Sequence, residues 1–228
     1  MKRLFRRLLE TATLLGALCL QGAHAGAVVV DFNDPALTNL YFPGDSFTQS
    51  GMVMTQDFDF GTVDSAAALG SVAPSGNATP FYFNSNDGAL FMQQEQGLQF
   101  SLTGFTAAFV PLSPASTQTT VMAAVGFDAS GSAVAAVAWL FAPQQSNGRY
   151  PFALYDNPVD FADFVDLSAL VFFSCSLSGG NLCDDPTNNN GQFALDDIQV
   201  TVVPEPSSVA LVVLALGLLV PSLRRRSR

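Results

Sequence analysis

The sequence predicts an all-β fold for residues 26–202, arranged as a two-sheet β-sandwich. Three observations support this prediction. Short stretches of alternating apolar and polar residues recur along the region, and clusters of Asn, Asp, Gly and Ser separate them. No long stretch has the 3.6-residue periodicity of a helix. The chain also contains 20 phenylalanines, enough to fill the space between two packed sheets.

The first half of this region contains four predicted strands. Residues 28–32 form the first one. Residues 52–60 alternate most regularly, with Met and Phe side chains on one face and Thr and Asp side chains on the other. This pattern is typical of a half-buried strand. The apolar runs 81–83 and 89–92 flank the turn-rich segment 84–88, and together they predict a β-hairpin.

The second half contains the remaining strands. The runs 121–127 and 132–141 are joined by Asp128-Ala-Ser-Gly131, which predicts a second hairpin. Its alanine-rich part, 133–138, would also suit a turn of helix, but the position after a hairpin turn favours a strand. The other predicted strands are one that begins at residue 98 and ends near Gly104, and the segments 161–166, 170–173 and 192–202.

Residues 1–25 have the three parts of a secretory signal peptide. Lys and Arg residues provide a basic start, residues 14–20 are apolar, and Ala23-His24-Ala25 matches an A-x-A cleavage site. An uncleaved anchor helix is the alternative, but the apolar stretch is short for a membrane span. We therefore expect cleavage between Ala25 and Gly26 and export of the mature chain.

The charge of the exported body excludes several classes of function. Between residues 26 and 203 there are 17 acidic residues against one basic residue, Arg149, so the net charge is −16. The only histidine, His24, lies in the signal peptide, and the body has no lysine. Such a surface repels nucleic acid, so no nucleic-acid partner is expected. Catalytic triads and His-ligated zinc sites also lack their residues, which leaves a pair of carboxylates as the one route to catalysis.

The two cysteines of the body predict a disulfide. Cys175 and Cys183 are separated by a segment containing Gly179-Gly180-Asn181, a strong turn signal. An even pair at this spacing in an oxidising compartment favours a bridge, which would contribute about 2–3 kcal/mol. A redox role is the weaker alternative because the C-x-x-C spacing is absent.

The C-terminal residues 203–228 form a three-part sorting signal. Val203-Pro204-Glu205-Pro206 precedes an apolar segment at 207–223, and Arg224, Arg225 and Arg226 follow it. The segment is close to the lower limit of about 17 residues for a membrane-spanning helix, and the arginines would stay on the cytoplasmic side. A plain membrane anchor is the alternative. The motif resembles the PEP-CTERM signal of Gram-negative bacteria, which implies an exosortase as partner and export across the inner membrane to the cell surface or extracellular matrix.

The body also resembles a recurring type among PEP-CTERM proteins. The matching phrases are residues 98–105, residues 125–131 and the final Gln192-Phe-Ala-Leu-Asp-Asp-Ile198, which has the Gln-Phe-x-x-Asp pattern of one such group. The resemblance implies a jelly-roll-like sandwich similar to carbohydrate-binding modules. It further implies that the first and last strands are neighbours and share a structural Ca²⁺.

The residues that would hold this Ca²⁺ are oxygen donors near the two strands. They are Asp31, Asn33, Asp34, Asp196 and Asp197. Alternation places Asp196 on the side of Ile198 and Val200, where its charge would need a cation or main-chain donors. In the alternative interpretation these acidic residues cap strand ends in solvent.

Sugar recognition would require aromatic rings with an exposed face. Tyr150 and Tyr155 bracket a Pro- and Asn-containing loop and are the better candidates, whereas Trp139 lies in an apolar run typical of a core. Taken together, the sequence predicts an exported, non-catalytic surface or matrix protein that an exosortase sorts and that associates with exopolysaccharide in a biofilm. The alternatives are a Ca²⁺-dependent carbohydrate-binding module and, less favoured, a carboxylate-based glycosidase.

Overall fold

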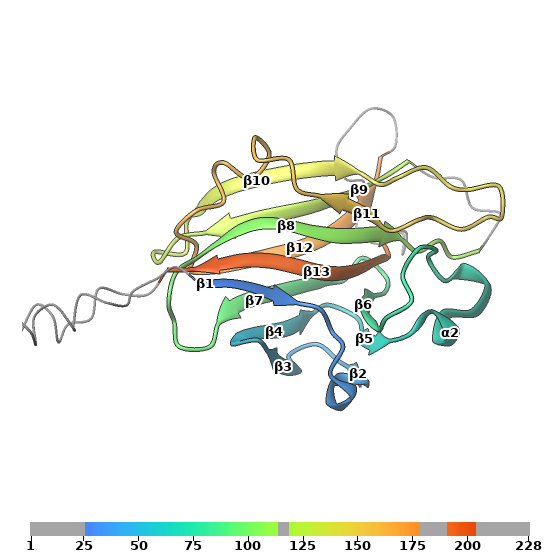
Figure 1. Ribbon diagram of the computed structural model, residues 1–228, viewed down its shortest axis with the longest axis horizontal. Coiled ribbons are helices and arrows are strands. Elements are labelled where there is room, and N and C mark those ends of the chain that lie inside the picture. Colours follow the sequence, from blue (N-terminus) through green and yellow to red (C-terminus); the bar gives the residue numbers. More distant parts are fainter. Residues whose placement is uncertain (1–25, 114–118, 178–190, 204–228) are drawn as a thin grey trace, which may run out of the picture. The chain divides into compact units, whose positions relative to one another are not determined.

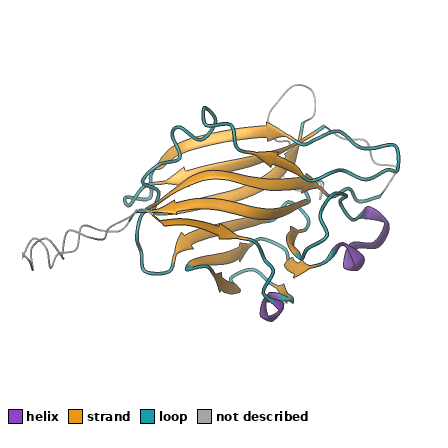
Figure 2. Cartoon of the chain, viewed as in Figure 1, coloured by secondary structure: helices purple, strands orange, loops and turns teal. Residues whose placement is uncertain are grey.

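The computed structural model describes residues 26–113, 119–177 and 191–203, and within these ranges the chain is all-β, as predicted. Two antiparallel sheets pack as a β-sandwich (Figure 1, Figure 2). Sheet A contains β1 (Gly26–Val30), β2 (Asn39–Tyr41), β5 (Gly61–Asp64), β6 (Phe81–Asn84), β8 (Phe100–Phe109), β11 (Ala153–Tyr155) and β13 (Phe193–Val202). Sheet B contains β3 (Ser46–Gln49), β4 (Met52–Asp57), β7 (Ala89–Gln94), β9 (Thr120–Phe127), β10 (Ala133–Leu140) and β12 (Ala169–Ser176).

The strand order shows how often the chain crosses between the sheets. Sheet A has the order β11-β8-β13-β6-β5-β2, and β1 also pairs with β13, so the first and last strands are neighbours. Sheet B has the order β10-β9-β12-β7-β4-β3. From β6 to β9 each successive strand lies in the opposite sheet. Three short helical turns complete the fold: η1 (Pro35–Leu37), α2 (Ala66–Leu69) and η2 (Gly70–Val72).

The inner faces of the two sheets enclose one large hydrophobic cluster. Leu170 and Phe172 on β12 alternate with outward-facing residues, as expected for strands with one buried face. Phe105 on β8 connects the two sheets, because its ring centroid lies 5.2 Å from that of Phe172 and 5.0 Å from that of Trp139. The aromatic residues counted in the sequence are therefore largely core residues.

The predicted strand 52–60 is too long. β4 ends at Asp57, because Phe58 and Asp59 have φ angles of 55° and 40°, which lie outside the range of a regular, unbulged strand. The amide of Gln56 donates to the carbonyl of Phe58 at 2.6 Å and holds this turn. The chain then enters sheet A at β5, and Phe58 is 67% exposed instead of facing the core.

The predicted hairpin at 81–92 is an arch between the sheets. Its flanking strands, β6 and β7, belong to sheet A and sheet B respectively. Asn86 and Asp87 take a left-handed conformation that is typical of turns, but the reversal passes across the sandwich. The Asp87 carboxylate accepts a hydrogen bond from the backbone N–H of Gly191 and ties the arch to the start of β13.

The other predictions differ in their outcome. The hairpin at 128–131 is confirmed, since β9 and β10 pair antiparallel around it, and residues 133–138 are strand, not helix. The predicted strand 161–166 is instead a series of turns whose buried members are Phe161 and Phe164. The strand predicted to begin at residue 98 and end near Gly104 is β8, which extends to Phe109.

The outer faces of the two sheets are covered to different extents. On sheet A, Phe81, Phe83, Val110 and Ala194 form a second buried cluster. Residues of α2 and η2 pack against it, together with Phe152. On sheet B, no helical element packs on the outer face within the described residues. This difference defines the candidate site.

Candidate functional site

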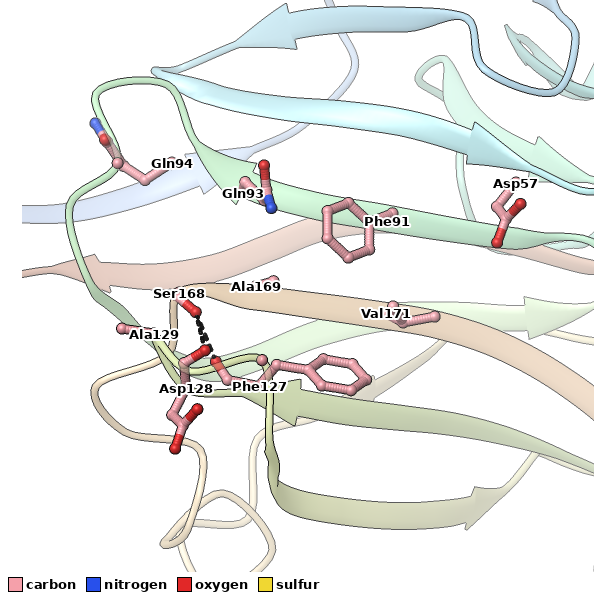
Figure 3. Close-up of a pocket in the computed structure, with 12 residues that line it drawn as sticks. Asp57, Phe91, Gln93, Gln94, Phe127, Asp128, Ala129, Ser168, Ala169 and Val171 are labelled. Carbon is pink, nitrogen blue, oxygen red and sulfur yellow. Dashed lines mark hydrogen bonds between the residues drawn. The ribbon is translucent and has the colours of Figure 1, made fainter.

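A shallow hollow of about 680 Å³ lies on the outer face of sheet B (Figure 3). Its floor comes from adjacent strands, because Phe91 on β7 pairs with Val171 on β12, and Ala169 on β12 pairs with Phe127 on β9. The neighbours of these residues in sequence, such as Leu90 and Met92, face the core. The strand alternation therefore presents this row of apolar side chains to the outside.

Two phenylalanine rings give the hollow its apolar surface. Phe91 and Phe127 are both only partly buried, and the small Ala169 and the branched Val171 lie between them on β12 (Figure 3). Ala169 adds little side-chain bulk between the two rings. The hollow is open to solvent along its length, which suits part of a chain better than an enclosed small molecule.

Polar side chains surround this floor. Asp57 from β4, Gln93 and Gln94 from β7, and Asp128 from the β9–β10 hairpin line the hollow. Carboxylates accept hydrogen bonds, and amide side chains both donate and accept them. The Ser168 hydroxyl also donates to the carbonyls of Phe127 and Asp128, which ties the start of β12 to the hairpin (Figure 3).

Asp128 is held in its ionised form by the hairpin. The Ser130 hydroxyl donates to Asp128 Oδ1 at 2.6 Å, and the backbone N–H groups of Ser130 and Ser132 donate at 2.8 and 3.0 Å. The side-chain hydrogen bond from Ser130, followed by these amides, lowers the pKa of Asp128 below its ordinary value. This carboxylate can accept hydrogen bonds at the rim of the hollow but is a poor proton donor.

The hollow has no positive charge. Arg149 is the only Lys, Arg or His between residues 26 and 203, and its guanidinium donates to the carbonyl of Gly70 at 3.4 Å. Gly70 begins η2, which covers sheet A and not sheet B. An anionic ligand would find no counter-charge in the hollow and would meet Asp57 and Asp128.

Asp196 lies on the other sheet and on its outer face, which corrects the predicted placement. Asp197 has a φ of 47° and forms part of a β-bulge, so the alternation shifts by one residue. Asp196 consequently shares the outer face with Ala194 instead of the core face with Ile198 and Val200. The segment containing Asn77 covers it, and only 2% of Asp196 is exposed.

Two side chains hold the Asp196 carboxylate under this cover. The Asn77 amide donates to Oδ2 at 2.6 Å, and the Thr79 hydroxyl lies 3.3 Å from the same oxygen. Burial raises the pKa of Asp196 to about 7, and the nearby Asp197 carboxylate adds to the rise, while the hydrogen bonds oppose it. Asp196 is thus the carboxyl suited to proton transfer, yet it lies on the opposite side of the sandwich from the hollow.

The remaining candidate Ca²⁺ ligands have separate roles. Asp31 accepts from the Gln49 amide at 2.7 Å, and Asp34 caps η1 by accepting from the Ala36 N–H at 2.9 Å. The backbone N–H of Asn33 donates to Asp31, and Asp197 is exposed on the bulge. The described ranges contain no group of three or more His, Cys, Asp or Glu side chains placed to hold a metal. The shared Ca²⁺ stays a prediction, which calorimetric titration of chelator-treated protein would test.

The two tyrosines predicted to stack on sugar pack against phenylalanines instead. Tyr150 is buried, and its ring meets Phe109 edge-on at 4.9 Å. The ring of Tyr155 stacks on Phe105 at 5.1 Å, and its hydroxyl donates to the carbonyl of Leu140 at 3.0 Å. Burial raises the pKa of Tyr155 to about 12. Trp139 is buried, as predicted.

Several predicted features fall outside the described residues. Cys175 ends up buried near the end of β12, but Cys183 lies in the range 178–190, so the disulfide stays a prediction. Of the sorting motif only Val203 is described, and of the cleavage site only Gly26. Among the described residues no helix has the length and hydropathy needed to cross a bilayer. The apolar segment 207–223 is not among them.

Sequence reasoning did not select Phe91, Phe127 or Gln93. A signal was present, because Phe91 and Gln93 alternate with the core residues Leu90 and Met92. The run of apolar residues at 89–92 has no polar member to mark its outer face, however. Only the packing of sheet A against sheet B, which buries Leu90 and Met92, identifies which side of this strand is open.

Comparison with known proteins gives distant structural likenesses only. No family model matches the chain, and no curated protein matches it. A DUF4465 family protein from Bacteroides caccae is 12% identical, with a TM-score of 0.47 over 77% of this chain and 98% of that one. The CBM22-1 xylan-binding domain of Paenibacillus barcinonensis Xyn10C is 9% identical, with a TM-score of 0.36 over 80% of this chain and 97% of that one.

A third solved structure is a family 11 carbohydrate-binding module from Clostridium thermocellum in complex with a β-1,3-1,4-mixed-linked tetrasaccharide. It is 12% identical, with a TM-score of 0.33 over 78% of this chain and 96% of that one. With identities this low and TM-scores below 0.5, these likenesses carry no statement about what this chain binds.

Proposed function

We propose that this chain is an exported, non-catalytic protein that binds a neutral polysaccharide across the outer face of sheet B. The observation that carries the proposal is the open hollow, in which two partly exposed phenylalanine rings are surrounded by amide and carboxylate side chains. Sugar rings present C–H surfaces that pack on aromatic faces, and their hydroxyls donate to carboxylates and amides. The apolar floor can pack on the sugar C–H surfaces, and the polar rim can accept hydrogen bonds from the sugar hydroxyls.

The charge of the hollow argues for a neutral ligand. Asp57 and Asp128 lie at the hollow, and the hydrogen bonds to Asp128 keep it ionised. A uronic acid or a sulfated sugar would bring further negative charge to a body whose net charge is already −16. A neutral glycan avoids this repulsion and still offers hydroxyl donors.

The arrangement of the acidic residues supports binding without turnover. A glycosidase needs a protonated carboxyl beside a second, ionised carboxylate at the scissile bond. In this chain the carboxyl with a raised pKa, Asp196, is buried behind Asn77 on the outer face of sheet A. The hollow is on the outer face of sheet B. The two chemical requirements of hydrolysis are therefore separated by the whole sandwich.

The sequence signals support a location of this binding activity outside the cell. The signal peptide would direct export. An exosortase would recognise the PEP-CTERM-like tail. The tail would hold the protein in the membrane until it is cleaved, or permanently if it is not cleaved. The body would be a jelly-roll-like sandwich with a Cys175–Cys183 bridge. Binding of exopolysaccharide in a biofilm matrix follows from this location together with the hollow.

Glycan binding is tested with the purified mature protein. A glycan array followed by calorimetry should give a neutral polysaccharide ligand, and Phe91→Ala or Phe127→Ala should weaken binding by about tenfold or more, equivalent to at least about 1.4 kcal/mol. Phe42→Ala is the matched control, because Phe42 is 56% exposed in the loop after β2 and does not line the hollow. No hits on neutral glycans, or equal losses in all three variants, would overturn the binding site.

Sorting is tested separately by deleting residues 203–228. We expect the wild-type protein to begin at Gly26, end near the Pro-Glu-Pro motif and have the mass of the oxidised cysteine pair. The deleted form should lose its normal location. Unchanged processing and location after the deletion would refute the sorting proposal without affecting the binding site.

A further inference from the structure

The edges of the two sheets differ strongly in length. Exposed strand edges carry unpaired backbone groups, and proteins protect them by keeping edge strands short or charged. Three edge strands of this sandwich are short, since β2 and β11 have three residues each and β3 has four. β1, which pairs only with β13, is a further edge strand of five residues, whereas β10 has eight residues and pairs only with β9 among the described strands (Figure 1).

β10 also lacks the other common protections. Its sequence, Ala-Val-Ala-Ala-Val-Ala-Trp-Leu, contains no charged residue and no proline. Val134 is 46% exposed and Leu140 is 63% exposed. A bulge near Ala133 interrupts the register with β9, but Ala135 to Leu140 remain in regular antiparallel pairing. Six regular residues are the usual length of a strand in a sheet.

The edge is also held rigid before any partner arrives. Trp139 packs in the core, its ring stacks on Phe161 at 5.2 Å, and its indole N–H donates to Asp160 at 3.1 Å. The Tyr155 hydroxyl donates to the carbonyl of Leu140 at the end of the strand. An ordered strand loses little further entropy on pairing, so the cost of adding a strand is reduced.

The charge of the body indicates what can occupy this edge. With a net charge of −16, two copies of the body repel each other over most of their surface. β10 is an eight-residue stretch without charge, so two copies that pair along it confine the approach of carboxylates to the ends of the strand. A second β10 supplies a partner edge of the same length and the same apolar character.

From these observations we propose that β10 is a self-association edge, through which two copies of this chain pair antiparallel and join their B sheets into one continuous sheet. In antiparallel addition about a twofold axis, the same face of both sheets stays on the same side. The two hollows would therefore face one way. This consequence rests on the proposed polysaccharide binding, and it would let one long polymer engage both copies with a gain from avidity.

Like charges near the ends of β10 make the association sensitive to salt. Asp128 precedes β10 in the hairpin, and Asp160 contacts Trp139 near the other end. Antiparallel pairing brings the first end of one strand toward the last end of the other, so Asp128 of each copy approaches Asp160 of its neighbour. Salt screens such exposed charges, and dimerisation should strengthen as its concentration rises.

Sedimentation velocity on the mature protein tests the proposal, at several protein concentrations and at low and high salt. Wild type should form a dimer whose dissociation constant falls with added salt. The double variant Ala136→Glu/Ala138→Glu places like charges on neighbouring strands and should raise that constant by about tenfold or more. The matched control, Ser46→Glu/Thr48→Glu, adds the same charge to the opposite edge of sheet B and should dimerise like wild type.

Each outcome has a defined meaning. A wild-type protein that stays monomeric at all concentrations and salts overturns the proposal, as does a dimer that the control disrupts and the β10 variant does not. Circular dichroism checks folding, and if the β10 variant does not fold, the salt dependence of wild type decides. Phe91→Ala should lose glycan binding and still dimerise, so failure of the binding site and failure of the association edge remain distinguishable.

Discussion

The outer faces of sheets A and B carry similar apolar residues, but other segments cover the face of sheet A and leave the face of sheet B open. On sheet A, Phe81 and Phe83 point outward and are buried under residues of α2 and η2 together with Phe152. On sheet B, Phe91 and Phe127 point outward in the same way and remain partly exposed beside polar side chains. The difference lies in what the connecting segments cover, since both sheets follow the same strand alternation.

This contrast separates stability from recognition within one sandwich. The cover on sheet A adds a second hydrophobic cluster and buries a carboxyl, which fixes that side of the molecule. The uncovered face of sheet B adds little to stability but keeps two aromatic rings available for a ligand. Substitutions on the outer face of sheet A should therefore lower stability and leave ligand binding intact. Substitutions on the outer face of sheet B should lower ligand binding and leave stability nearly unchanged.

The largest expected effect compares Phe81→Ala with Phe91→Ala. Phe81 is 1% exposed and meets Phe152 edge-on at 5.2 Å, so its truncation should lower the free energy of unfolding by about 3–5 kcal/mol. Phe91→Ala should cost about 1 kcal/mol or less, because its ring is only partly buried. Urea unfolding followed by the fluorescence of Trp139, the only tryptophan, measures both. Equal losses would show that the two faces are packed alike.

A second prediction concerns the pH dependence that Asp196 gives to the covered face. The unfolded carboxyl ionises near 3.8, whereas the native one keeps its proton until about pH 7. Between these values the native state binds more protons than the unfolded state. The stabilisation is complete below the unfolded pKa and is lost as the pH rises through 7, with a slope of up to about 1.4 kcal/mol per pH unit.

Asp196→Asn should remove this decline in stability, measured by urea unfolding between pH 4 and pH 8 in the presence of a chelator. Asp197→Asn is the control, because Asp197 is exposed and asparagine tolerates the left-handed conformation of that position. The control should retain most of the decline. A wild-type profile without a decline would mean that Asp196 is ionised under its cover and that the hydrogen bonds from Asn77 and Thr79 are enough to hold the charge.

The sequence predicts the architecture better than it predicts the faces. Alternation and turn residues identify the two packed sheets and the 128–131 hairpin, and the neighbouring first and last strands are what the family resemblance implies. They do not identify the positive φ of Asp197, because no glycine marks the bulge. One inserted residue moves Asp196 from the core face to the outer face, and the predicted surroundings of its carboxylate change with it.

The candidate site depends on contacts that are distant in sequence. Tyr150 and Tyr155 looked accessible because they flank a polar loop, but Phe109 and Phe105 of β8 pack on their rings. Conversely, Phe91 lies in an apolar run that is typical of a buried core strand. Phe91 is partly exposed because no segment covers β7 in the described ranges. Whether a segment covers a strand depends on the path of the whole chain.

The smallest expected effect concerns the rim of the open face and uses Ser130→Ala. The Ser130 hydroxyl is the first cause of the lowered pKa of Asp128, so its removal should raise that pKa toward the ordinary value. A depressed carboxyl pKa adds stability above the unfolded value, and this contribution disappears as the pH falls. The backbone donors of Ser130 and Ser132 remain, so the hairpin should persist.

Carboxyl NMR titration of wild type and Ser130→Ala measures the change directly. Glycan binding at neutral pH should change by less than about threefold, because Asp128 stays ionised there and both phenylalanine rings are intact. A loss as large as that of Phe91→Ala would mean that the orientation of Asp128 decides recognition. The open face would then resemble the covered one in depending on a fixed carboxylate, and the contrast between the two sheets would lie in their exposure alone.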